Sequence, residues 1–203
     1  MNPVTVLPNP NISPAGIVSQ KFCQLNLTTF HQACHWVKNL PYGSNSSNQD
    51  SLIIFQEAKA TCTNKHGIIS RLAAELNLEI YKNLGFYQLN DEIVTGVNKI
   101  IQPYGLSFIP QIHCFLEYQN YRVDLTEGNC NGKNKTIEDY DFVVRVKPDL
   151  TYQEHQAYYL EYLAKYFLIE PKLKDFEATD VLGLLAQCEQ HLKYQCSVMY
   201  QAI

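Results

Sequence analysis

Two stretches of the chain decide the fold: KATCTNKHG at residues 59–67 and IPQIHCFLEYQNYRVDLT at residues 109–126. The first opens a segment with helical spacing, and Cys62 falls in its first predicted turn. The second holds two β-rich runs around a polar dipeptide, and it carries His113 and Asp124. A thiol attacks a carbonyl well only as a thiolate, so it needs a nearby imidazole and a carboxylate that holds the imidazole in the correct tautomer. The order Cys62, His113, Asp124 supplies one candidate for each role.

The predicted helix favours a reactive cysteine. Thr61 offers an N-cap, and apolar residues then recur on one face at Ile68, Ile69, Leu72, Ala73 and Leu76. In the first helical turn, Cys62 faces the positive end of the macrodipole and backbone N–H groups, which favour the thiolate. The alternative is a cysteine that only packs, because free cysteines are among the most often buried residues.

The hairpin places the base and the orienter together. With a two-residue loop at the centre, Tyr118 faces Tyr121. Phe115 then faces Asp124, and His113 lies on the adjacent diagonal of the same face, about 7–8 Å away at Cα. The opposite face is apolar and consists of Ile112, Cys114, Leu116, Val123 and Leu125. The alternative is a structural pair or two independent surface residues.

The remaining pattern is mixed α and β. The predicted elements are an irregular or peripheral arm at 1–14, a helix from Thr28 or Thr29 to Asn39-Leu40-Pro41, a strand at 78–89, a helix at 91–101, a strand at 141–146, and helices at 152–167 and 179–194 separated by a turn at Ile169-Glu170-Pro171.

Composition excludes several functional classes. Charged residues are 18% of the 203 residues, hydrophobic residues are 46%, and the formal net charge is -4, so a basic nucleic-acid footprint is absent. No run of 18 apolar residues and no cationic leader occur, which argues against membrane insertion and export. Seven cysteines at irregular spacing favour a reducing compartment. We expect a cytoplasmic protein without nucleic-acid or membrane partners.

Residues 61–67, 109–116 and 123–126 together resemble the core of the transglutaminase-like superfamily, within the wider papain-like thiol enzymes. The order of Cys, His and Asp matches, as does a helix-borne cysteine that precedes a histidine and an aspartate on neighbouring strands. The chain departs from the family in the residues before the nucleophile, where Ala60-Thr61 replaces a common glycine.

The resemblance implies an α+β fold, with a catalytic helix packed on an antiparallel sheet and two extra C-terminal helices. It implies one domain over 1–203, with the core at 28–147 and the C-terminal helices at 151–195. Its implied chemistry is acyl transfer through a thioester on a peptide, protein or small amide substrate, by hydrolysis or transamidation and without cofactor or metal. Gln56, six positions before Cys62, matches the spacing of the papain-like oxyanion-hole glutamine.

Two rival readings stay open at the level of sequence. The first is a catalytically silent binding or scaffold protein that keeps the fold. The second is a metal-dependent hydrolase that uses His31, Cys34 and His35, which share one predicted helical face but lack a recognisable fourth ligand.

Overall fold

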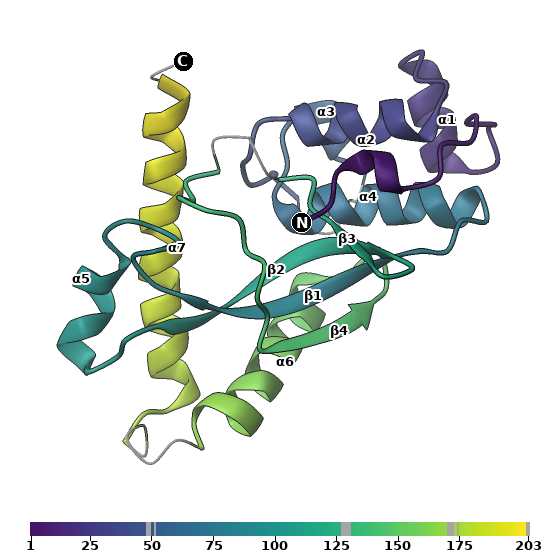
Figure 1. Cartoon of the computed structure of the whole chain (residues 1–203). Helices are drawn as coiled ribbons and strands as arrows, with labels where there is room; N and C mark the ends of the chain where they lie inside the picture. The colour runs from purple at the N-terminus through teal and green to yellow at the C-terminus, as the bar shows by residue number, and fades with distance from the viewer. Residues whose placement is uncertain (48–49, 51, 127–130, 170–172, 174, 202–203) are drawn as a thin grey trace. The chain divides into compact units, whose positions relative to one another are not determined.

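The computed structural model describes residues 1–47, 50, 52–126, 131–169, 173 and 175–201. It shows a mixed α+β fold around a four-stranded antiparallel sheet with strand order β3-β2-β1-β4 (Figure 1). The α+β class is therefore confirmed. The elements in chain order are η1 (Val4–Val6), α1 (Ile17–Gln24), α2 (Phe30–Asn39), α3 (Ile54–Glu57), α4 (Cys62–Glu75), β1 (Ile80–Leu89), α5 (Val97–Ile101), η2 (Gln102–Tyr104), β2 (Ile109–Tyr118), β3 (Tyr121–Val123), β4 (Phe142–Val146), α6 (Tyr152–Tyr162), η3 (Leu163–Phe167) and α7 (Ala178–Gln201).

The chain divides into two compact units, each assembled from separate stretches. The first comprises Met1–Gly85, His113–Asn129 and Val143–Leu150, and the second comprises Phe86–Ile112, Cys130–Phe142 and Thr151–Ile203. The expected single domain over 1–203 stays a prediction.

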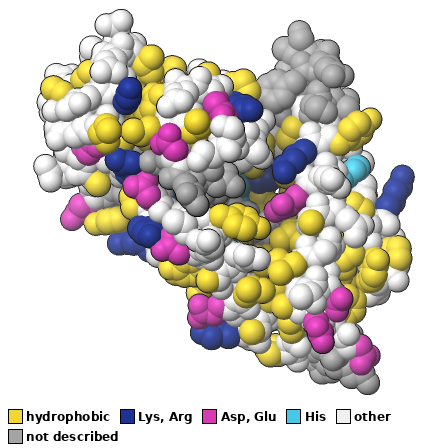
Figure 2. Space-filling model, turned by 180° about the vertical axis from the view of Figure 1, so that it is seen from behind, with side chains coloured by type: hydrophobic (Ala, Val, Ile, Leu, Met, Phe, Trp, Pro, Cys, Tyr) yellow, Lys and Arg dark blue, Asp and Glu magenta, His cyan; other side chains and the backbone are white. Residues whose placement is uncertain are grey.

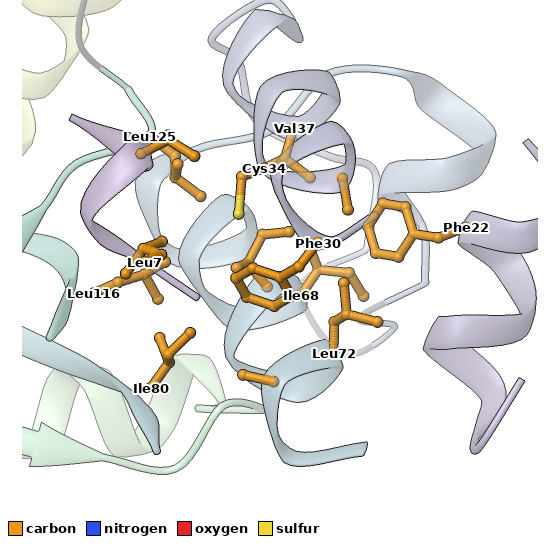
Figure 3. Close-up of a cluster of buried hydrophobic side chains, with 14 of the residues drawn as sticks. Leu7, Phe22, Phe30, Cys34, Val37, Ile68, Leu72, Ile80, Leu116 and Leu125 are labelled. Atoms are coloured by element: carbon orange, nitrogen blue, oxygen red, sulfur yellow. The ribbon is translucent and has the colours of Figure 1, made fainter. Parts of the chain in front are cut away.

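The core of the first unit lies between α4, the helices beside it and the sheet. In Figure 1, α4 runs between the strands of this unit and helices α1 to α3. Figure 3 shows how side chains from these elements interdigitate, with Phe22 and Phe30 from the outer helices and Ile68 from α4 packed into one cluster. Burial of this apolar surface holds α4, and therefore its first turn, against the sheet.

Local signals account for the two helices that flank this core. α2 begins at a capping box, in which the Thr29 side chain accepts from the Gln32 amide, as the sequence predicted. α4 begins at Cys62, and Thr61 occupies its N-cap position as expected. The Thr61 side chain, however, makes no capping hydrogen bond. The buried Lys65 ammonium donates to the carbonyl oxygens of Lys38, at 3.0 Å, and Leu40, at 2.6 Å, and so joins α4 to the end of α2.

The hairpin register agrees with the prediction. Tyr118 pairs with Tyr121, and Leu116 pairs with Val123 two positions further along each strand. Gln119 adopts a positive φ of 53°, which closes the two-residue loop. The predicted apolar face is buried throughout.

The N-terminal arm is irregular as predicted, but it is not peripheral. Val4, Leu7 and Ile12 are buried and join the core of the first unit. The amide of Asn2 donates to the Arg122 carbonyl oxygen at 2.7 Å, so the arm continues along the exposed edge of β3. Three isolated apolar residues without periodicity gave no sign of this burial.

In the second unit, aromatic packing positions the C-terminal helices. Tyr162 of α6 stacks on Phe86 of β1 with ring centroids 4.3 Å apart. Tyr159 is buried and donates its hydroxyl proton to the Pro110 carbonyl oxygen at 2.7 Å. Two tyrosines of α6 thus pack against residues of the sheet within this unit.

The predicted helix at 91–101 is shorter than expected. Only α5, Val97–Ile101, forms, because Gly96 adopts a left-handed φ of 94° and interrupts the apolar pattern. The other predicted helices and strands agree with the structure to within a few residues, although α7 continues to Gln201, and α1 was not predicted. The predicted turn at Glu170-Pro171 lies outside the described residues.

The described part of the chain contains no helix long and apolar enough to cross a membrane. On the face shown in Figure 2, the acidic and basic side chains of the described residues are intermixed and do not form separate patches.

Candidate active site

His113 and Asp124 form a buried pair in the first unit. The Nε2 atom of His113 lies 2.7 Å from Oδ2 of Asp124. Both residues are almost inaccessible to solvent, His113 at 1% and Asp124 at 6%. Because Asp124 occupies Nε2, the other ring nitrogen, Nδ1, is the atom through which His113 can exchange a proton with a further partner. The predicted contact is therefore present.

The other oxygen of the Asp124 carboxylate is also held. Both the backbone amide and the hydroxyl group of Thr126 donate to Oδ1, each at 2.7 Å. Burial favours the neutral acid, but the charge of His113 and its hydrogen bond hold the pKa of Asp124 well below the usual range of an aspartate. The carboxylate is thus fixed in its ionised form and in one orientation.

Cys62 is the first residue of α4 and is only partly buried. Its position exposes the thiol to the positive end of a 14-residue helix. Among the described cysteines, Cys23 is the other one with intermediate exposure, whereas Cys34, Cys114, Cys188 and Cys196 are buried. The structure therefore leaves two accessible thiols among the described residues, and one of them stands at a helix N-terminus.

A second thiol lies beside Cys62. The hydrogen bond with the Cys62 side chain, together with burial, raises the pKa of Cys114 well above its usual range. Cys114 therefore keeps its proton and can donate it to an ionised Cys62. Because Cys114 follows His113 in β2, this contact places Cys62 against the strand that carries the imidazole.

A buried cation completes the electrostatic surroundings. Lys82 of β1 is 1% exposed, and its Nζ atom donates to the Pro148 carbonyl oxygen at 3.1 Å. Burial lowers the pKa of Lys82, while the charges of Cys114 and Cys62 oppose that shift. A cation in a low-dielectric position near both thiols favours the thiolate form of the more exposed one.

His66 has a structural environment that sequence reasoning did not find. The side chain lies one helical turn after Cys62 and is fully buried. Its Nδ1 atom lies 2.8 Å from the Cys62 carbonyl oxygen, and its Nε2 atom accepts from the Leu125 amide at 2.8 Å. The spacing of four residues from Cys62 was the available signal, whereas the contact with Leu125 depends on the tertiary fold.

Gln56 is not brought into this cluster. It is exposed on α3, and its side chain makes no hydrogen bond among the described residues. Nothing in its contacts assigns it to an oxyanion hole, and that role stays a prediction.

The three residues of the metal hypothesis differ in their surroundings. Cys34 is buried in the core, whereas its neighbour His35 is exposed. The His31 imidazole makes a 2.8 Å hydrogen bond with the Leu7 carbonyl oxygen. No group of three or more potential ligands gathers among the described residues.

Comparisons with protein-family models, with curated protein sequences and with solved structures find no significant match.

Proposed function

We propose that the protein is a cysteine-dependent acyl-transfer enzyme with a transglutaminase-like core. The observation that carries the proposal is the buried His113–Asp124 pair at 2.7 Å, in which Nε2 of His113 faces the carboxylate and Nδ1 is the second basic nitrogen of the ring. Cys62 is the candidate thiol, because it is accessible, begins a helix and lies beside the chain neighbour of His113.

In the proposed reaction, Cys62 passes its proton to Nδ1 of His113 and attacks the carbonyl carbon of an amide or peptide. The electron pair of the carbonyl moves to oxygen and gives a tetrahedral oxyanion, which backbone N–H groups in the first turn of α4 can stabilise. Thr61 makes no side-chain bond to these groups. As the oxyanion collapses, the carbon–nitrogen bond breaks, and the imidazolium of His113 donates its proton to the departing amine.

The resulting thioester then reacts with water or with a second amine. His113 removes a proton from that nucleophile and returns it to the Cys62 sulfur as the thioester breaks. Asp124 stabilises the imidazolium at both stages without accepting its proton. The proposed substrate is a peptide, a protein or a small amide.

The test is to trap the thioester. Wild-type protein is incubated with panels of amides, peptides and activated esters, and intact-mass spectrometry then seeks an adduct on Cys62 that hydroxylamine removes. We expect an adduct that is absent from Cys62→Ala and strongly reduced in His113→Ala. A matched Cys23→Ala variant, in which the other partly buried thiol is removed, should behave like wild type. No adduct from any panel, with Cys62 inert toward thiol reagents, would favour the scaffold reading.

A further inference from the structure

The strongest additional feature of the described chain is His66, a fully buried histidine that joins two parts of the proposed site. It lies one helical turn after Cys62 and beside the segment that carries Asp124. The proposed reaction does not use it as an acid, a base or a nucleophile. Its contacts nevertheless involve the residues on which that reaction depends.

The hydrogen bonds of His66 fix its tautomer. The Cys62 carbonyl oxygen can only accept, so Nδ1 of His66 carries the proton. The Leu125 backbone N–H can only donate, so Nε2 carries none. Both polar atoms of the neutral imidazole are thereby satisfied. A second proton on Nε2 would point at the Leu125 N–H.

These two bonds join two elements that are far apart in the chain. Cys62 opens α4, and Leu125 directly follows Asp124, beyond the end of β3. Nε2 of His66 also lies 3.4 Å from Oδ1 of Asp124, although the tautomer leaves no proton between them. The rings of His66 and His113 meet edge to face, with centroids 6.1 Å apart. The His66 imidazole therefore contacts the Cys62 carbonyl oxygen and the backbone next to Asp124, and it lies close to the ring of His113.

We propose that His66 is a positioning residue, which holds the first turn of α4 and the Asp124 segment in the register that lets Cys62 and His113 exchange a proton. The inference rests on the proposed function of this site. Small displacements at such a site are costly, since a shift of about 1 Å can lower the rate by roughly 100-fold.

Three variants separate the two bonds. His66→Leu removes both of them. His66→Asn places a side-chain amide near the position of Nδ1 and keeps a donor for the Cys62 carbonyl oxygen. His66→Gln reaches the position of Nε2 and keeps an acceptor for the Leu125 N–H. Ile69→Val, a substitution at another fully buried position of α4, controls for a loss of stability that is unrelated to the bonds.

The measurement is the rate at which iodoacetamide alkylates Cys62 at pH 6, followed by peptide mass spectrometry, with Cys23 as internal reference and thermal unfolding as the check on folding. We expect His66→Leu to lower the Cys62 rate by about 10- to 100-fold. His66→Asn and His66→Gln should give intermediate rates, and Ile69→Val and Cys23 should stay at wild-type values. In the His66→Leu background, His113→Ala should have little further effect, because the coupling is already lost.

The proposal is overturned if folded His66→Leu keeps the wild-type rate and its dependence on His113, or if Ile69→Val slows alkylation equally. If His66→Leu does not fold, wild-type rates in both His66→Asn and His66→Gln overturn it instead. A wild-type Cys62 whose alkylation is independent of His113 is a different result, since it removes the proposed function itself and the role of His66 with it.

Discussion

Nε2 of His113 and Oδ2 of Asp124 lie 2.7 Å apart in the buried part of the first unit, although eleven positions separate the two residues in the chain. The hairpin brings them together, and Thr126 holds the second oxygen of the carboxylate. The ionised Asp124 side chain therefore affects two properties, which are the free energy of unfolding and the tautomer of His113.

The first prediction concerns stability at acidic pH. The pKa of Asp124 is well below its usual value in the folded protein, whereas an unfolded aspartate titrates near about 3.9. The stabilisation is therefore complete above pH 3.9 and is lost as the pH falls through the lower, folded pKa. Urea unfolding of wild type and Asp124→Asn should show a difference that shrinks from pH 6 to pH 3. The exposed Asp149→Asn variant is the control, and a difference for Asp124→Asn that stays constant over this range would contradict the account.

The second prediction concerns the tautomer of His113. Asp124→Asn keeps the shape of the side chain but can present an amide N–H to Nε2, which would leave the proton on Nδ1, where a base must accept one. Acylation of Cys62 should fall on the order of 10²- to 10⁴-fold, with a cooperative thermal transition retained. Single-turnover kinetics with the substrate found by trapping measure the effect. An acylation rate like that of wild type would make Asp124 purely structural and reduce the triad to a dyad.

The sequence predicts those parts of the site that depend on residues close together in the chain. Alternation along the hairpin predicted the register of Tyr118 with Tyr121 and the meeting of His113 with Asp124. Both follow from the period of two in a strand and from the length of one turn. The start of α4 at Cys62 followed from similarly local signals.

Contacts between distant segments had no such signal. The bond from Leu125 to His66 joins residues 59 positions apart, and the ammonium of Lys82 is buried in a strand whose pattern did not reveal what surrounds it. Contacts of this kind follow from the tertiary fold and cannot be predicted from a local sequence pattern.

The third prediction concerns Lys82. Lys82→Met removes the buried cation near both thiols while keeping a long apolar side chain, so the thiolate of Cys62 loses a favourable charge. Alkylation of Cys62 at pH 6 should slow by roughly 3- to 10-fold, which corresponds to about half to one pKa unit. Lys59→Met, a substitution of a half-exposed lysine just before α4, should have a smaller effect. Equal rates for Lys82→Met and wild type would exclude an electrostatic role for this side chain.

The fourth prediction concerns stability at alkaline pH. Burial lowers the pKa of Lys65 to about 8, against a value near 10.4 for an unfolded lysine, although the charges of Asp124 and Cys62 oppose the shift. Between these values the unfolded chain binds a proton that the folded protein lacks, so rising pH favours the folded state. Wild type should gain stability relative to Lys65→Met from pH 8 to 10.5, by up to about 1.4 kcal/mol per pH unit.

Urea unfolding at several pH values measures this gain. The exposed Lys99→Met variant is the control and should follow wild type. A stability difference between wild type and Lys65→Met that falls with pH would show that the lysine is favoured as a cation in the folded protein.

The most direct test of the central claim, that Cys62 and His113 work as a coupled pair, is the pH dependence of Cys62 alkylation in wild type and in His113→Ala. A thiolate–imidazolium pair stabilises both charged partners, so wild-type alkylation should persist well below the value of about 8.5 expected for an unperturbed cysteine. In His113→Ala the rate should instead rise once and at a higher pH than in wild type, while Cys23 behaves alike in both proteins. A single rise near 8.5 in wild type, unchanged by His113→Ala, would contradict the account and leave the fold as a binding scaffold.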